Sequence, residues 1–337
     1  MQPESDSHPM SKPVLAIGLE ADDDRRAIIK DALGDTGDAV YLMDMEEAER
    51  RVMMTTADAV FIGHTRQLPE DGIGLSGETC KLLQFYSAGV DFLPLKQFPE
   101  DLPIAGNGGA FAEPMAEHGL AMTLAAAKRL FIEHDNLKAG EFNQFARNKM
   151  LAGSVCGILG FGGIGKAQAK LMRGLGMKIH AINRSGATDE DVDWIGTPDQ
   201  LEEFLAASDV VVLSLPLSQW TEKLFNAERL SQMKPNAILV NLARGEIIDE
   251  DDLYAHLQAN PDFTACIDAW WIEPVRHGKF EMGHPFLDLP NVIGSPHNSA
   301  SVGVWRAVAV RRAIANIVLA LTGETPQHLV RPEERML

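Results

Sequence analysis

Short apolar runs alternate with amphipathic segments along the first hundred residues. Runs at 13–19, 38–44 and 57–63 predict buried strands, and a fourth at 81–93 predicts another strand that ends in a glycine turn. Between the first two runs, residues 22–33 begin with acidic side chains and continue with apolar residues at helical spacing, which predicts a helix. This alternation of strands and helices is typical of a parallel α/β sheet.

A second series of the same kind begins near residue 155. The run CGILGFGGIG at 156–165 predicts a strand followed by a glycine loop, and residues 166–176 predict the helix that follows it. The further apolar runs that predict buried strands lie at 177–183, 209–217, 237–243, 263–270 and 291–295.

Two long helices flank this second series. Residues 112–135 are rich in Met, Leu and Ala on all sides, which predicts a helix buried between two bodies. Residues 301–323 predict an amphipathic helix that packs back on the first series. We therefore predict two doubly wound α/β domains with a ligand cleft between them. Residues 1–109 and 298–337 would form the first domain, and 110–297 the second.

Charge and cysteine content exclude several classes of function. The net charge of −18 argues against a nucleic acid or an anionic membrane as partner. Three scattered cysteines, Cys80, Cys156 and Cys266, predict neither a disulfide framework nor a metal site. The polar start at 1–13 predicts a disordered leader without a signal sequence, and no apolar run is long enough to span a membrane. We expect a cytoplasmic protein.

The glycine loop predicts a dinucleotide site. Gly160 allows a tight turn, Gly162 lets the backbone approach a pyrophosphate, and Gly165 lets helix and strand pack closely. The amides at the start of the following helix then face the anion.

The residue expected to bind the ribose is not acidic. An acid normally stands about 20 residues after the loop, where it bonds the ribose hydroxyls. Asn183 occupies that position here, and Arg184 and Ser185 follow it. A guanidinium and a hydroxyl suit a 2′-phosphate, so we expect NADPH in preference to NADH, with NADH left open.

Three polar residues follow predicted strands of the second domain. Arg244 stands in NLARGEIID, Glu273 in DAWWIEP and His297 in SPHNSA. Residues just past the carboxyl ends of parallel strands line the ligand crevice, so these three are candidates for one site. His277 and His284, in the polar segment 273–286 that is a candidate lid, are expected to be surface residues.

Several motifs together resemble one known family. GILGFGGIG, LPLSQWT, MKPNAILVNLARGEIID, IDAWWIEP and NVIGSPHNSA, with the earlier SAGVD and AEHGLAMTL, resemble the D-isomer-specific 2-hydroxyacid dehydrogenases over roughly residues 80–325. Within that family the NRSG stretch looks most like the NADPH-linked glyoxylate/hydroxypyruvate reductases. The resemblance implies a flavodoxin-like substrate domain, a Rossmann cofactor domain and a homodimer with the 112–135 helix at the interface.

The resemblance also implies catalytic roles. Arg244 would hold the carboxylate of a small 2-keto acid and polarise its keto group. His297 would donate the proton to the keto oxygen during reduction, and Glu273 would bond its other ring nitrogen and favour the protonated ring. Formate enzymes of the family carry Gln in place of Glu273, which counts against formate as substrate. A 3-phosphoglycerate-type enzyme and a dinucleotide-sensing corepressor stay open as alternatives.

Binding positions follow from the same resemblance. The substrate carboxylate would also meet the backbone of Ala88, Gly89 and Val90, and Asp268 would contact the nicotinamide carboxamide. With Asp268, the positions expected at the dinucleotide are Gly160, Phe161, Gly162, Gly163, Ile164, Gly165, Asn183, Arg184, Ser185, Leu215, Pro216, Thr221, Leu242, Ala243, Arg244 and His297.

Overall fold

The chain folds into two compact units. A computed structural model describes residues 12–68 and 74–337, so most of the predicted leader lies outside the described residues. Unit 1 comprises Met1–Ala110 and Arg306–Leu337, and unit 2 comprises Phe111–Trp305. The chain therefore returns from unit 2 to unit 1 after Trp305, whereas the sequence predicted this return after residue 297. Residues beyond His297 stay with unit 2 because Asn298 N–H bonds Asp268 Oδ1 and Ala300 packs on the core of that unit.

Unit 1 is built on a five-stranded parallel sheet in the order β2-β1-β3-β4-β5. This is the flavodoxin-like order that the resemblance implied. The strands are β1 (Val14–Ile17), β2 (Asp38–Tyr41), β3 (Ala59–Ile62), β4 (Leu82–Phe85) and β5 (Ile104–Ala105). The helices are α1 (Asp23–Leu33), α2 (Glu47–Thr56) and α10 (Trp305–Thr322), with short 3-10 helices η1 (Leu42–Asp44), η2 (Thr65–Gln67), η3 (Leu95–Gln97) and η7 (Pro332–Glu334).

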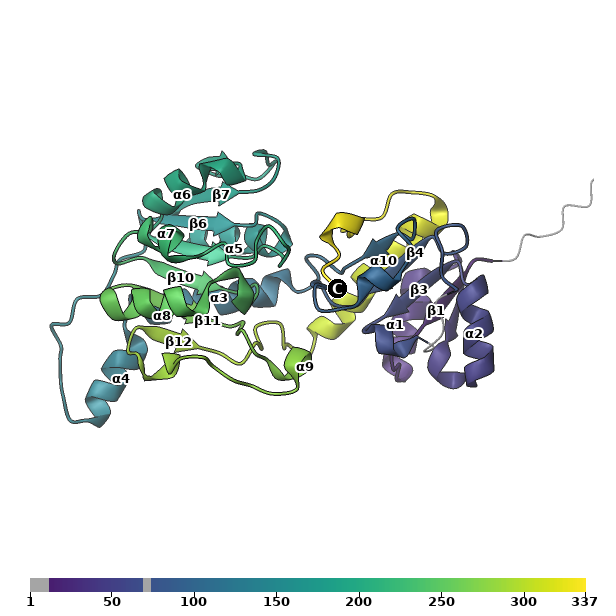
Figure 1. Cartoon of the computed structure of the whole chain (residues 1–337), viewed down its shortest axis with the longest axis horizontal. Coiled ribbons are helices and arrows are strands. Elements are labelled where there is room, and N and C mark those ends of the chain that lie inside the picture. Colours follow the sequence, from purple (N-terminus) through teal and green to yellow (C-terminus); the bar gives the residue numbers. More distant parts are fainter. Residues whose placement is uncertain (1–11, 69–73) are drawn as a thin grey trace, which may run out of the picture. The chain divides into compact units, whose positions relative to one another are not determined.

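Both faces of this sheet are buried. Leu15 and Ile17 of β1 face α1 and α10, whereas Ala16 between them faces the side covered by α2. Figure 1 shows α10, at the yellow end of the chain, lying along this sheet beside strands from its purple beginning. The C-terminal helix therefore closes a core that the N-terminal strands begin.

Unit 2 is built on a seven-stranded parallel sheet in the order β12-β11-β10-β9-β6-β7-β8. The strands are β6 (Val155–Leu159), β7 (Lys178–Ile182), β8 (Trp194–Gly196), β9 (Val210–Leu213), β10 (Ile238–Asn241), β11 (Thr264–Ile267) and β12 (Val292–Gly294). The helices are α3 (Ala112–Ala127), α4 (Leu130–Lys138), α5 (Gly163–Gly174), α6 (Leu201–Ala207), α7 (Ala227–Ser231), α8 (Glu250–Ala259) and α9 (Pro274–His277), with 3-10 helices η4 (Pro198–Gln200), η5 (Gly245–Ile247) and η6 (Phe286–Asp288). The chain order reverses between β6 and β9, which is the Rossmann switch point.

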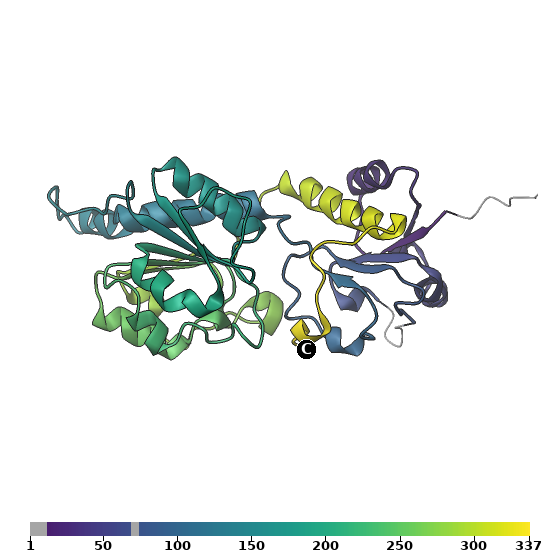
Figure 2. The ribbon, with the colours of Figure 1, turned by 90° about the horizontal axis from the view of Figure 1, so that it is seen from above.

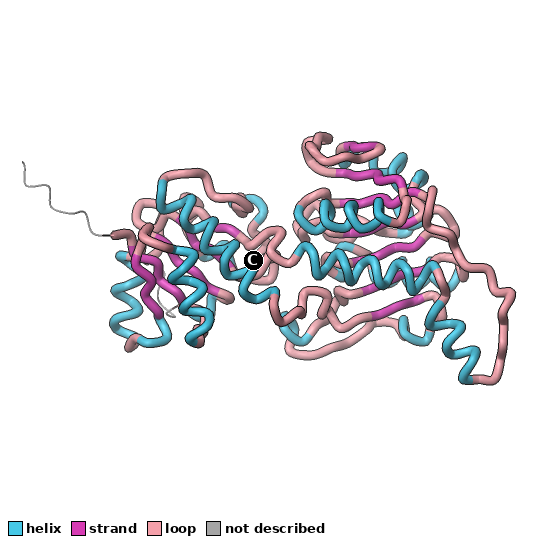
Figure 3. Tube along the Cα trace, turned by 180° about the vertical axis from the view of Figure 1, so that it is seen from behind, coloured by secondary structure: helices cyan, strands magenta, loops and turns pink. Residues whose placement is uncertain are grey.

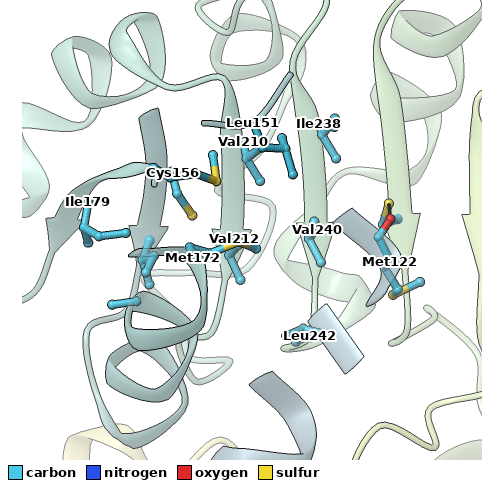
Figure 4. Packing of buried hydrophobic residues seen from close by; sticks show 14 of the residues in the cluster. Met122, Leu151, Cys156, Met172, Ile179, Val210, Val212, Ile238, Val240 and Leu242 are labelled. Carbon is cyan, nitrogen blue, oxygen red and sulfur yellow. Dashed lines mark hydrogen bonds between the residues drawn. The ribbon is translucent and has the colours of Figure 1, made fainter. Parts of the chain in front are cut away.

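Helices cover both faces of the second sheet, as Figure 2 shows. On one face α3 packs against α5 and against β10 and β11. The core between them contains Met122 of α3 and Met172 of α5 with apolar residues of the central strands, drawn in Figure 4. In Figure 3 the strands of each unit form one layer between helices. The two doubly wound sheets expected from the sequence are thus present.

Two predicted elements differ from the structure. The helix expected over 112–135 is interrupted at Arg129, whose φ of 54° is left-handed, and α4 beyond the break has no buried residue. The sequence has neither Gly nor Pro at the break, so it carried no signal for it. The strand expected over 81–93 is confined to β4, because the chain turns away after Phe85. No helix among the described residues is both long and apolar enough to cross a membrane.

Candidate active site

The glycine loop joins β6 to α5 at the switch point. Gly160 has a φ of 96°, and a Cβ there would lie 2.7 Å from the backbone nitrogen of Leu215. A Cβ at Gly165 would lie 2.4 Å from the carbonyl oxygen of Gly160, so both positions require glycine. Around Gly162 no described atom lies within 4 Å of an added Cβ, which leaves its backbone open to a ligand. This loop therefore fits a pyrophosphate at the start of α5.

Neighbouring residues of the loop are fixed by the core. Phe161 is buried, and Ile164 packs against the central apolar cluster while Gly163 begins α5. Ser214, at the end of β9, donates its hydroxyl to the carbonyl oxygen of Gly160 at 2.8 Å. The loop after β9 is thereby held against the glycine loop, and it carries Leu215 and Pro216.

That second loop is closed by Thr221. Its hydroxyl donates to the carbonyl oxygen of Pro216 at 2.8 Å and accepts the N–H of Ser218 at 2.8 Å. Thr221 therefore shapes the loop that places Leu215 and Pro216.

Asn183 forms the turn that follows β7. Its Oδ1 accepts the N–H groups of Ser185 at 3.1 Å and Gly186 at 2.7 Å, and its Nδ2 donates to the carbonyl oxygen of Ala187 at 2.8 Å. The carboxamide is thus committed to its own turn. The turn places Arg184 and Ser185 on the surface, where both are exposed.

The turn after β10 carries Arg244. Buried Asn241 fixes this turn, because its Oδ1 accepts the N–H of Ala243 at 3.0 Å and its Nδ2 donates to the carbonyl oxygen of Arg244 at 2.8 Å. Leu242 and Ala243 are buried. A Cβ at Gly245 would lie 2.3 Å from the carbonyl carbon of Trp270, so this turn contacts the segment after β11 directly.

Glu273 and His297 form a hydrogen-bonded pair. The Nδ1 of His297 lies 2.9 and 2.8 Å from the two carboxylate oxygens of Glu273, which is 6% exposed. Glu273 Oε1 also accepts the N–H of Trp270 at 2.7 Å. Because Nδ1 is committed to Glu273, Nε2 is the ring nitrogen of His297 that can serve a substrate.

The charges around Glu273 favour its ionised form. Burial raises the pKa of Glu273, but the hydrogen bond and charge of His297, the Trp270 N–H and the charge of Arg244 outweigh it and hold the pKa below the ordinary 4.5. The three candidate residues therefore belong to one electrostatic environment at the ends of β10, β11 and β12.

Asp268 follows β11 and is fully buried. Its carbonyl oxygen accepts the N–H of His297 at 2.9 Å, and this turn holds His297 at a left-handed φ of 49°. Its Oδ1 accepts the hydroxyl of Ser295 at 2.6 Å, whereas Oδ2 has no hydrogen-bond partner among the described residues. A buried orphaned carboxylate oxygen fits an N–H donor of a cofactor.

The positions predicted to bind the substrate carboxylate through the backbone belong to unit 1. Ala88, Gly89 and Val90 follow β4 in unit 1, where Asn107 fixes the loop through the carbonyl oxygens of Ser87 and Tyr86. Their contact with a substrate beside Arg244 stays a prediction.

The predicted surface histidines have structural partners. Nδ1 of His277 accepts the N–H of Glu273 at 3.0 Å, and Nε2 of His284 lies 2.7 Å from Asp251 Oδ1. Within the described ranges, no group of three or more His, Cys, Asp or Glu is arranged to hold a metal ion. The three cysteines are buried and unbridged, and burial raises the pKa of Cys80 and of Cys156 to about 12, which keeps both thiols protonated.

Comparison with known proteins decides the family. Residues 120–299, more than half of the chain, match the model of the D-isomer specific 2-hydroxyacid dehydrogenase NAD binding domain. The chain belongs to this family of dehydrogenases. A hydroxypyruvate reductase from Thermotoga maritima is 29% identical to this dehydrogenase over 81% of this chain and 87% of its own.

Two further proteins are similar to this chain, one in sequence and one in fold. A glyoxylate reductase from Thermococcus onnurineus is 30% identical over 75% of this chain and 77% of its own. A D-isomer specific 2-hydroxyacid dehydrogenase from Xanthobacter autotrophicus Py2, solved in complex with NADPH and MES, superposes with a TM-score of 0.73 at 24% identity, over 94% of this chain and 98% of its own. The fold of this dehydrogenase is therefore that of solved relatives.

The sequence did not predict the contacts that four polar residues make with the candidate residues of the site. Asn241, His277, Ser295 and His118 hold Arg244, Glu273 and Asp268 in place. Asn241 interrupts the apolar run 237–243 and Ser295 ends the run 291–295, which was the available signal. His118 lies 177 residues before its partner Ser295, so only the fold relates them.

The Glu273 environment predicts a pH dependence of stability in this dehydrogenase. A carboxyl group whose pKa is lowered by folding stabilises the fold above pH 4.5, and this contribution is lost as pH falls through the folded pKa. The stability advantage of the wild type over Glu273→Gln should therefore shrink as pH falls below 4.5. Urea denaturation at a series of pH values, followed by tryptophan fluorescence, measures it. Glu222→Gln, at an exposed position, is the control, and an advantage that is constant with pH would contradict the account.

Proposed function

We propose that this dehydrogenase reduces small 2-keto acids, such as glyoxylate or hydroxypyruvate, to D-2-hydroxy acids with NADPH. The observation that carries the proposal is the Glu273–His297 pair beside the Arg244 turn, on the sheet that also carries the glycine loop. The names of the reductases from Thermotoga and Thermococcus support the substrate class. The cytoplasmic location stays a prediction from the sequence.

The dinucleotide would be held along the carboxyl ends of the strands of unit 2. Backbone amides of the loop from Gly160 to Gly165, with Phe161, Gly162, Gly163 and Ile164, would bind the pyrophosphate. Leu215, Pro216, Thr221, Leu242 and Ala243 would line the path toward the nicotinamide end. Asp268 Oδ2 would accept an N–H of the carboxamide, which would complete the hydrogen bonding of that buried oxygen.

The chain's own residues would then handle the substrate. The hydride for the keto carbon is supplied by bound NADPH. Arg244, together with the backbone of Ala88, Gly89 and Val90, would bind the substrate carboxylate, because a guanidinium forms two parallel bonds with it. His297 would give the proton on Nε2 to the keto oxygen, while Glu273 retains the bond to Nδ1 and stabilises the ring in its orientation.

We also propose that the enzyme is a homodimer. The segment from α4 to residue 150 projects from the sheet of unit 2 in Figures 1 and 3. Its large apolar side chains are exposed, namely Leu130, Phe131, Leu137, Phe142, Phe145 and Met150. Several exposed aromatic and aliphatic side chains in one segment favour an interface, and a second copy of the chain is the partner that the family resemblance implies.

His297→Ala should lower the turnover of the preferred 2-keto acid about 100-fold or more, because the keto oxygen loses its proton donor. Loss of nicotinamide absorbance with a panel of 2-keto acids, each with NADPH and with NADH, measures it. His284→Ala is the matched control and should leave turnover near the wild-type value. Near-normal turnover of His297→Ala would remove His297 from the mechanism. If the wild type turned over only a phosphorylated substrate, the 3-phosphoglycerate-type enzyme would be favoured. If it turned over no substrate, the dinucleotide-sensing corepressor would be favoured.

Arg184→Ala should raise KM for NADPH about tenfold while changing KM for NADH less than about twofold, because only the 2′-phosphate loses a charged partner. Initial rates at varied nucleotide concentration check this. Lys170→Ala removes one exposed positive charge from α5 and is the control. Equal losses with both nucleotides would contradict the preference for NADPH.

Phe142→Glu combined with Phe145→Glu should convert a dimer to a monomer in sedimentation velocity, because charges would replace apolar contacts. Val52→Glu, at an exposed apolar position in α2, should leave the dimer intact. A wild type that sediments as a monomer would refute the dimer.

A further inference from the structure

The two oxygens of the Asp268 carboxylate have different surroundings. Oδ1 accepts the hydroxyl of Ser295 at 2.6 Å and the N–H of Asn298 at 3.3 Å. Oδ2 is buried and has no partner in the part of the chain that is described. Burial of a polar oxygen without a donor is costly, so this asymmetry points to a ligand that supplies one.

The order of protons in this group follows from its chemistry. The Ser295 hydroxyl donates to Asp268 Oδ1, so its proton lies toward the carboxylate. The Nε2 of His118 lies 2.9 Å from the same hydroxyl oxygen and must therefore be the donor in that contact. The sulfur of Met122, at 4.0 Å from Ser295 Oγ, is a much weaker competitor for the hydroxyl proton. The result is a chain from His118 N–H through Ser295 O–H to Asp268.

This chain ties three separate segments of unit 2 together. His118 belongs to α3, Ser295 follows β12, and Asp268 follows β11. His118 is partly exposed, at 26% of its side chain, whereas Asp268 is fully buried. Hydrogen bonds in such a chain polarise one another, so the orientation of the carboxylate depends on both Ser295 and His118.

We propose that His118 and Ser295 are positioning residues for the cofactor, which hold Oδ1 of Asp268 so that Oδ2 is presented to the carboxamide N–H of the nicotinamide. This inference rests on the proposed function in placing a dinucleotide on unit 2. Neither residue touches the reacting atoms, and both act through Asp268.

Removal of the hydroxyl shows why the orientation depends on it. In Ser295→Ala, Oδ1 keeps the Asn298 N–H at 3.3 Å, and His118 Nε2, which lies 3.6 Å from Oδ1, has lost its own acceptor. The carboxylate then turns toward that nitrogen, and Oδ2 leaves its alignment with the carboxamide. His118→Leu removes the outer donor and weakens the same bond from the other end.

The test compares two nucleotides by isothermal titration calorimetry without substrate. One is NADPH, and the other is its 3-acetylpyridine analogue, which keeps the carbonyl but has a methyl group in place of the amide nitrogen. Ser295→Ala and His118→Leu should each weaken NADPH binding about tenfold and binding of the analogue less than about threefold. Ser295→Thr keeps a hydroxyl and His118→Gln keeps an N–H donor, so both should bind NADPH within about threefold of the wild type.

Each outcome bears on the inference. If Ser295→Ala and His118→Leu weakened the binding of both nucleotides equally, the inference would be overturned. It would also be overturned if Ser295→Thr and His118→Gln lost as much NADPH affinity as Ser295→Ala and His118→Leu. Neither result would contradict the dinucleotide site itself. A wild type that binds neither NADPH nor NADH would refute the dinucleotide site itself and the inference with it. A selective loss of NADPH affinity would support the inference even if no 2-keto acid were reduced. Thermal melting of each variant without nucleotide establishes that it folds. Ser295→Ala and His118→Leu alter different segments, so the test can be made with either variant if the other does not fold.

Discussion

The buried carboxylate of Asp268 is the constraint on which the site depends. The backbone carbonyl of Asp268 accepts the N–H of His297, which has a left-handed φ. The side-chain Oδ1 of Asp268 accepts the hydroxyl of Ser295 and the N–H of Asn298. The turn that results places Nδ1 of His297 on Glu273, which leaves Nε2 for a substrate. One acidic residue thus fixes the ring of His297 and retains a buried oxygen that has no hydrogen-bond partner among the described residues.

The parallel sheet supplies the rest of the arrangement. Successive strands of unit 2 deliver their carboxyl ends to one edge, so residues more than a hundred positions apart gather there. The glycine loop after β6, the Asn183 turn after β7 and the Arg244 turn after β10 are each shaped by hydrogen bonds of short polar side chains or by a glycine that no other residue replaces. The positions of the candidate residues at this edge therefore depend on turn geometry more than on the strands themselves.

The sequence predicted the parts of this arrangement whose signal is local. The glycine spacing, the apolar runs and the polar residues that follow them predicted the two sheets, the dinucleotide loop and the candidates Arg244, Glu273 and His297. It did not predict the break at Arg129, because a left-handed residue other than glycine leaves no mark in the sequence. Nor did it predict the chain from His118 to Asp268, because its members are distant and each is an ordinary residue until the fold unites them.

We propose that Asp268, Arg244 and His297 together receive a nicotinamide and a 2-keto acid. A crystal structure of the enzyme with NADPH and oxamate, an unreactive analogue of a 2-keto acid, tests it most directly. The account predicts the carboxamide nitrogen within about 3 Å of Asp268 Oδ2, the oxamate carboxylate on the Arg244 guanidinium, and the neighbouring oxygen on His297 Nε2 at a similar distance. A carboxamide turned away from Asp268, with oxamate bound elsewhere, would contradict it.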